Sequence, residues 1–366
     1  MNAVRLRRLL SSFAFAAGLL GVGGGPASAH SAANSPSSDY VSALRSVVPG
    51  TIRFSVRVVE AGSRLELTWR SGGTLIVEGY DGEPYLRVTA GGVEENLRST
   101  ATYANRTRVG TQVIPDDADP AAPPKWSRIS THPVARFHDH RIHWMGTSRP
   151  PVVAQSPGRI HHVQDWTVVV RDGEQASAST WKINGTLDWI PGPSPSVPLA
   201  GAAALAAAIV VAALWAGRSP ARRRALRVPV MIVASLLVAV DAVHLAGIAG
   251  GILGGSIVGQ FLSVGWASVA AWIMVVVAMA LMARGRDDAL YLLTFAGGII
   301  TLVGGMADLT VLSRTSVVFA YSITLARTVV ALTLGLGIGL VVASVLLTRP
   351  LQKRRPPSVN TAPLSV

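Results

Sequence analysis

The chain has no cysteine among its 366 residues, and charged residues make up only 14% of it. Without cysteine, no disulfide, thiolate metal site or catalytic thiol can form. With 49% hydrophobic residues and a mean hydropathy of +0.41, the composition is too apolar for a protein that is soluble throughout. It predicts membrane-spanning segments.

Sequence motifs of the common enzyme classes are also missing. The chain contains no serine nucleophile elbow, phosphate-binding P-loop, dinucleotide-binding glycine pattern or HExxH zinc motif. We therefore expect that the protein is not an enzyme.

The formal net charge of +13 does not indicate a basic binding surface. Between His30 and Pro195, 17 basic residues are balanced by 16 acidic ones. Most of the other basic residues flank long apolar runs, where they act as orientation signals for membrane helices. We expect the lipid bilayer as a partner, and no nucleic acid.

The first 29 residues are typical of a secretory signal peptide. A start containing three arginines is followed by an apolar run from Leu9 to Val22 and by the cleavage-site pattern Ala27-Ser28-Ala29. We expect residues 30–190 to form the exported part of the protein.

Residues 30–190 show the period-two alternation of half-buried strands. Strands are predicted near residues 52–59, 65–69, 74–79, 85–89, 161–171 and 176–188, with glycine-rich turns between several of them. Short strands at this spacing predict an all-β, immunoglobulin-like sandwich. Residues 96–157 are expected to form a long irregular insertion.

A proline-rich linker, residues 191–198, leads to an all-α membrane domain, residues 199–349. The five apolar segments of this part are long enough to cross a bilayer: 197–216, 228–250, 260–283, 289–307 and 317–347. Basic residues follow the first, third and fifth segments. This pattern predicts a multi-pass plasma-membrane protein with the β domain outside and a cytoplasmic tail, residues 350–366.

Four polar residues interrupt the membrane segments. Asp241 and His244 share one helix face at i, i+3, Asp308 ends the fourth segment, and Arg327 lies in the fifth. An unpaired charge in hydrocarbon is costly, which predicts an ion pair between Asp241 and Arg327. Such a pair could lock two helices together or belong to a polar site that opens outward.

The densest cluster of candidate ligands lies in the exported part, at Arg136-Phe-His-Asp-His-Arg-Ile-His-Trp-Met145. His138 and His140 point to one face if the chain is extended, and His143, His132 or Met145 could complete a copper or zinc site. In the alternative interpretation, these histidines form a structural polar network that binds no metal.

Three stretches resemble segments of a family of exported actinobacterial membrane proteins: Gly79–Arg87, His138–Met145 and Trp189–Pro195. The bias toward arginine over lysine fits such a source. The layout, an exported β sandwich with His and Met joined to membrane helices, is also loosely similar to copper-resistance proteins of the CopC/CopD type. That similarity implies copper as a ligand.

Three functions remain open from the sequence. The first is a cell-envelope protein whose His-rich exported domain binds copper or another transition metal. The second is a metal-free scaffold or interaction protein with an envelope protein as partner. The third is a small transporter or sensor subunit that uses the intramembrane polar residues.

Overall fold

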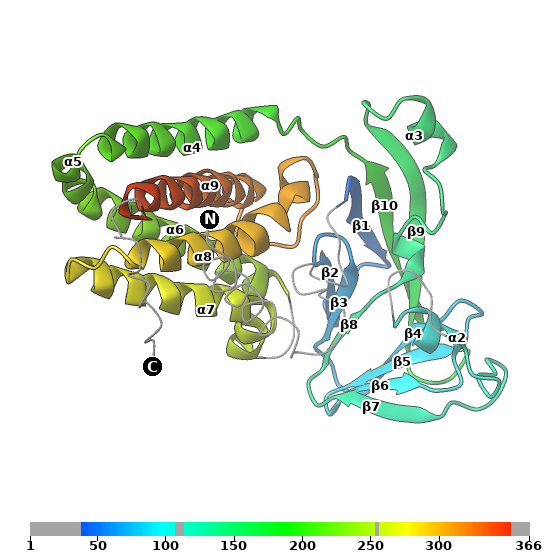
Figure 1. The fold of residues 1–366 in the computed structure, drawn as a ribbon. Coiled ribbons are helices and arrows are strands. Elements are labelled where there is room, and N and C mark those ends of the chain that lie inside the picture. Colours follow the sequence, from blue (N-terminus) through cyan, green and yellow to red (C-terminus); the bar gives the residue numbers. More distant parts are fainter. Residues whose placement is uncertain (1–37, 107–112, 253–255, 353–366) are drawn as a thin grey trace, which may run out of the picture.

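The computed structural model describes residues 38–106, 113–252 and 256–352. The predicted signal peptide and most of the predicted tail lie outside these ranges. Figure 1 shows an N-terminal β domain beside a bundle of long helices. This arrangement of an all-β part followed by an all-α part confirms the predicted fold class.

The β domain consists of two antiparallel sheets. The larger sheet has the order β1 (Tyr40–Val48), β10 (Thr180–Trp189), β9 (His161–Asp172), β4 (Thr74–Glu78), β5 (Pro84–Thr89), β6 (Gly92–Asn96) and β7 (Trp126–Ser130). The smaller sheet has the order β2 (Phe54–Val59), β3 (Arg64–Trp69) and β8 (Val134–Phe137). Apolar side chains of both sheets form one core.

Strand β3 illustrates how the sequence pattern produces this packing. Leu65, Leu67 and Trp69 are buried in the core, as the alternation predicts. Between them, Glu66 contacts Arg57 on β2 and Arg136 on β8 at 2.6 and 2.5 Å. Burial opposes ionisation of this carboxyl, but hydrogen bonds from both arginines lower the pKa of Glu66 overall.

The expectation of an irregular insertion at residues 96–157 is wrong. The described part of this segment contains α2 (Thr100–Ala104), β7, β8, the 3-10 turn η1 (His140–Ile142) and α3 (Pro151–Gln155). β8 pairs with β3, and β7 pairs with β6. These strands have only four and five residues, so pairing partners distant in sequence, rather than their own propensity, determine them.

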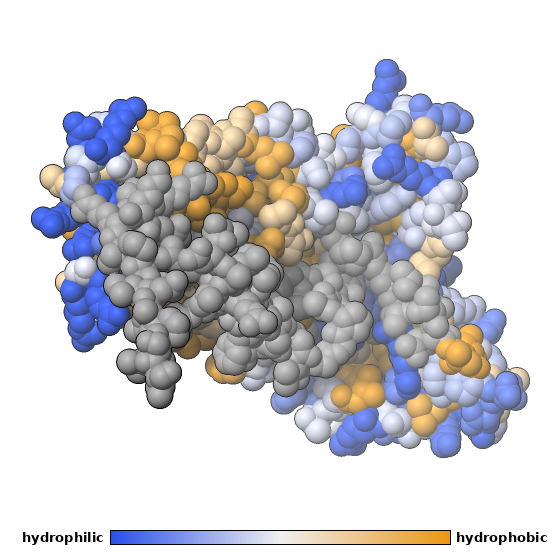
Figure 2. Space-filling model, in the orientation of Figure 1, coloured by the Kyte–Doolittle hydropathy of each residue, from blue (hydrophilic) through white to orange (hydrophobic). Residues whose placement is uncertain are grey.

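The second half of the described chain is helical. Its elements are α4 (Ser196–Gly217), α5 (Pro220–Ala225), α6 (Arg227–Gly251), α7 (Ile257–Ala283), α8 (Ala289–Ile300), the π-helix η2 (Thr301–Met306), the 3-10 turn η3 (Leu309–Leu312) and α9 (Ile323–Gln352). Five stretches of helix are long and apolar enough to span a membrane. Figure 2 shows hydrophobic residues over the helices and mainly hydrophilic ones over the β domain. A multi-pass membrane protein is confirmed, and its orientation stays a prediction.

The β domain contacts the membrane domain through residues 313–316, which we call the docking segment. Ser38 and Ser316 exchange two backbone hydrogen bonds, at 2.9 and 2.8 Å. Asp39 forms an ion pair with Arg314 at 2.7 Å, and the Thr315 hydroxyl donates to the carbonyl of Ile190. Because this segment precedes α9, the last helix begins at Ile323, six residues later than expected.

Candidate functional site

Two polar residues of α6 lie inside the helical bundle. Asp241 and His244 are 1% and 3% exposed, although the helix around them is apolar. Their i, i+3 spacing places both on the inner face of α6, as predicted. Asp308, also a candidate from the sequence, lies between η2 and η3 and contacts His244.

Among the described residues, hydrogen-bond partners are found for one oxygen of the Asp241 carboxyl group. The indole N–H of Trp272 on α7 donates to Oδ2 at 2.8 Å, and the buried Ser268 hydroxyl also interacts with this carboxyl group. Oδ1 has no hydrogen-bond partner among the described residues. It points at Gly304, where an added Cβ would lie 2.3 Å from it. The carboxyl group therefore lies against the π-helix with one oxygen uncompensated.

His244 lies between Asp241 and Asp308, at the end of the bundle nearest the β domain. Its Nε2 lies 2.9 Å from Oδ2 of Asp308, while no residue in the described ranges binds its Nδ1. The side chains of His244 and Asp308 are 3% and 16% exposed, so Asp308 is the more accessible of the two. An imidazole with one nitrogen toward a more accessible acid and the other free to bind a proton can pass a proton across its ring.

The predicted ion pair between Asp241 and Arg327 is wrong. The guanidinium of Arg327 donates instead to the carbonyls of Arg314 at 2.8 Å and Val311 at 3.4 Å. These carbonyls are at the end of η3, where unpaired carbonyls attract cations. The sequence did not indicate that η3 would pack against α9, so this contact could not be predicted.

Trp272, Ser268 and Gly304 were not among the candidates from the sequence. A signal for Trp272 was available, because an indole N–H in the middle of an apolar helix needs an acceptor. The positions of Ser268 and Gly304 depend on helix packing, which the sequence does not indicate.

The site offers few further oxygen ligands for a metal cation. The hydroxyls of Thr301 and Thr333, on the elements next to Asp241, donate to carbonyls of their own helices at 2.6 and 2.8 Å. Sodium and divalent ions need several oxygen ligands. The geometry therefore fits a proton better than a metal ion.

In the histidine-rich stretch, the central contact is an ion pair. Asp139 is fully buried, and its Oδ2 lies 2.6 Å from Arg141. The Arg141 guanidinium also donates to the carbonyls of Glu78 at 2.9 Å and Gly79 at 3.4 Å. Together these contacts attach η1 to the end of β4.

His138 and His143 converge on the backbone carbonyl of Ser63. His138 Nδ1 lies 2.8 Å from this oxygen and His143 Nε2 lies 3.0 Å from it. Because a carbonyl only accepts, both of these nitrogens carry protons. The other nitrogen of His138, Nε2, accepts from Arg64 at 3.1 Å. Both ring nitrogens of His138 thus have protein partners.

The other candidate ligands lie apart from this pair. His140 stacks on Tyr80, with a centroid separation of 6.4 Å, while His132 and Met145 are exposed. Burial and the charge of Asp139 raise the pKa of Tyr80 to about 12, so this phenol stays neutral at ordinary pH. In the described ranges, no three His, Cys, Asp or Glu side chains are placed to hold a metal ion. Copper or zinc binding therefore stays an untested prediction.

Replacing His138 by Ala separates the two interpretations of this stretch. We expect a loss of about 1–3 kcal/mol in the free energy of unfolding, because Ser63 and Arg64 lose a buried partner. Thermal melts of the full chain test this, with the exposed His132→Ala as control. Calorimetric titration with Cu(II) should give the same heats for both variants. Copper binding that is lost in His138→Ala without a lower melting temperature would support the metal site instead.

Comparisons with protein-family models, curated proteins and solved structures found no match for this chain. No relative therefore assigns a function, and the resemblances stated above stay predictions. The functional argument depends on the geometry of the chain itself.

Proposed function

We propose that the protein is a proton-responsive sensor subunit of the cell envelope, in which an exported β domain is coupled to an intramembrane acid. The observation that carries the proposal is the unpartnered oxygen of Asp241, buried in the bundle below His244 and Asp308. An ionised carboxylate in hydrocarbon is costly unless it is paired, and no ion pair in the described part of the chain includes Asp241. Proton uptake removes that cost.

Only a short stretch of chain connects Asp308 with the segment that contacts the β domain. Asp308 directly precedes η3, and η3 leads to the docking segment, which bonds to Ser38 and Asp39. Arg327 of α9 also bonds to this stretch, because its guanidinium donates to the carbonyls of Val311 and Arg314. A change in the charge of His244 or Asp308 therefore acts on the element that carries the β domain.

The distribution of titratable residues along the helices fits a sensor better than a transporter. Between Asp241 and the Arg227 end of α6, the helix has no Asp, Glu, His, Lys or Arg, and the same holds for residues 268–283 of α7 and 333–348 of α9. A proton pathway across the membrane needs a chain of such groups. In the part of the chain that the structure describes, the titratable groups next to Asp241 are His244 and Asp308, which lie on its β-domain side.

Amide hydrogen exchange of the full chain in liposomes tests the coupling. We expect that protection of the Ser38 and Ser316 amides, which bond across the interface, depends on pH in the wild type but much less in Asp241→Asn. Asp39→Asn, which breaks the pair with Arg314, should lower protection equally at every pH. Identical pH profiles for the wild type and Asp241→Asn would contradict the proposal.

A further inference from the structure

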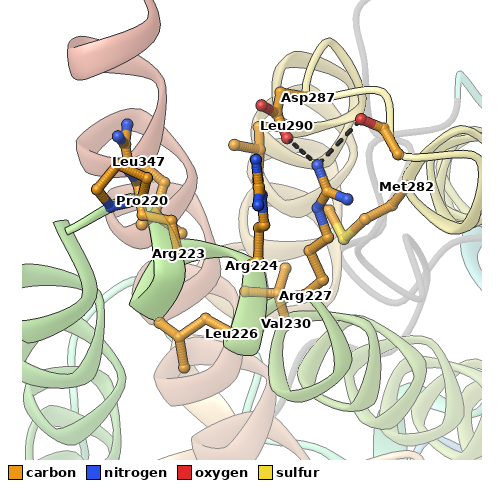
Figure 3. A pocket seen from close by; sticks show the side chains of 11 residues that line it. Pro220, Arg223, Arg224, Leu226, Arg227, Val230, Met282, Asp287, Leu290 and Leu347 are labelled. Carbon is orange, nitrogen blue, oxygen red and sulfur yellow. Dashed lines mark hydrogen bonds and ion pairs between the residues drawn. The ribbon is translucent and has the colours of Figure 1, made fainter.

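The end of the helical bundle farthest from the β domain contains a cavity of about 280 Å³. It is lined by residues of α5, α6, α7, α8 and α9, by Leu226 between α5 and α6, and by the loop between α7 and α8. Figure 3 shows Arg223, Arg224 and Arg227 spread across the site, with apolar side chains such as Leu290, Leu347 and Met282 beside them. The cavity thus joins a basic side to an apolar wall.

Only one of the three arginines has an acidic partner among the described residues. Arg227 bonds to Asp287 at 2.7 Å and to the carbonyl of Gly285 at 3.0 Å, as the dashed lines in Figure 3 show. Arg223, by contrast, has buried Nε and Nη1 atoms for which the described residues supply no hydrogen-bond partner. Arg224 is exposed. Three guanidinium groups against one carboxylate leave this cavity with an excess of positive charge.

Unpartnered buried guanidinium donors are costly, and a phosphate oxygen is the acceptor that matches their planar fork. The apolar wall includes Val230, Leu290 and Leu347, which lie on three spanning helices and can contact glycerol and acyl groups. A free phosphate would gain nothing from this wall. We propose that the cavity binds the phosphate headgroup of an anionic phospholipid, a site independent of the Asp241 cluster.

Purified full chain in detergent, stripped of lipid, provides the test. Native mass spectrometry would measure retention of added phosphatidylglycerol and phosphatidylcholine, and thermal melts would compare phosphatidylglycerol with inorganic phosphate. We expect preferential binding of phosphatidylglycerol, reduced roughly fivefold by Arg223→Gln and further by Arg223→Gln with Arg224→Gln.

Arg222→Gln is the matched control. Arg222 belongs to the same helix, but it stacks on Trp215 at 4.6 Å and does not line the cavity, so its loss should change retention little. If the double variant does not fold, Arg223→Lys can be used instead. It retains the charge but lacks the planar guanidinium, so it should still weaken binding. Equal retention in the wild type and the Arg223 variants would overturn the proposal. Stabilisation by inorganic phosphate as strong as that by the lipid would also overturn it.

Discussion

Replacing Asp139 by Ala should lower the free energy of unfolding of the β domain by about 3 kcal/mol, or the melting temperature by about 5–10 °C. The carboxylate is fully buried, and its removal leaves the guanidinium of Arg141 without its counter-charge. The carbonyls of Glu78 and Gly79 would also lose their donor if Arg141 turned toward solvent. Tryptophan fluorescence during thermal unfolding of the full chain measures this loss.

A matched control is available at the surface. Asp117 is 61% exposed and lies 3.8 Å from Arg98, so Asp117→Ala should change stability by less than about 1 kcal/mol. The double variant Asp139→Ala with Arg141→Leu should lose less than the single variant, because no isolated charge remains. Equal losses in the Asp117 and Asp139 variants would refute the buried pair as a stabilising contact.

Replacing Gly304 by Ala should destabilise the membrane domain by about 1–3 kcal/mol through overpacking. The new Cβ would lie 2.3 Å from Oδ1 of Asp241 and 3.5 Å from a methyl carbon of Thr333. The carboxyl must move, whereas the contact with Thr333 is an ordinary van der Waals contact. Thermal unfolding of the purified full chain in detergent measures the effect.

Two further variants show whether Asp241 causes this loss. An alanine Cβ at Gly298, six residues earlier in the same helical stretch, meets no atom within 4 Å, so Gly298→Ala should be neutral or slightly stabilising. Adding Asp241→Ala to Gly304→Ala should recover most of the lost stability, because the clashing carboxyl is gone. Additive losses in the double variant would contradict the close approach of Gly304 and Asp241.

Much of the architecture could be predicted because it depends on local pattern. The five membrane spans follow from long, largely apolar runs, and strands β2, β3, β4, β5, β9 and β10 follow from alternation and turns. Strands β1, β6, β7 and β8 were not predicted, because pairing with other strands rather than a clear alternation of their own determines them. The first strand was predicted to begin at Ile52, but this residue is 91% exposed and β2 begins at Phe54.

The candidate site was predictable only in part. Asp241, His244 and Asp308 were identified because charged groups are rare in apolar segments. Their partners were not, because the π-helix at Thr301–Met306 and the turn η3 alter which groups meet. Within the histidine stretch, ligand density predicted a metal site. The structure surrounds His138 with a carbonyl and a guanidinium, whose positions depend on the β2–β3 turn, and metal binding there stays a prediction.

The central claim, that Asp241 takes up a proton inside the bundle, is tested most directly by infrared difference spectroscopy of the full chain between acidic and alkaline pH. We predict a protonated carboxyl band that titrates in the wild type and is absent in Asp241→Asn. Trp272→Phe should shift this band, because it removes the N–H that bonds to Oδ2. Adding Na⁺ at constant pH should leave it unchanged. Wild-type and Asp241→Asn spectra without any difference in the carboxyl region would contradict the account.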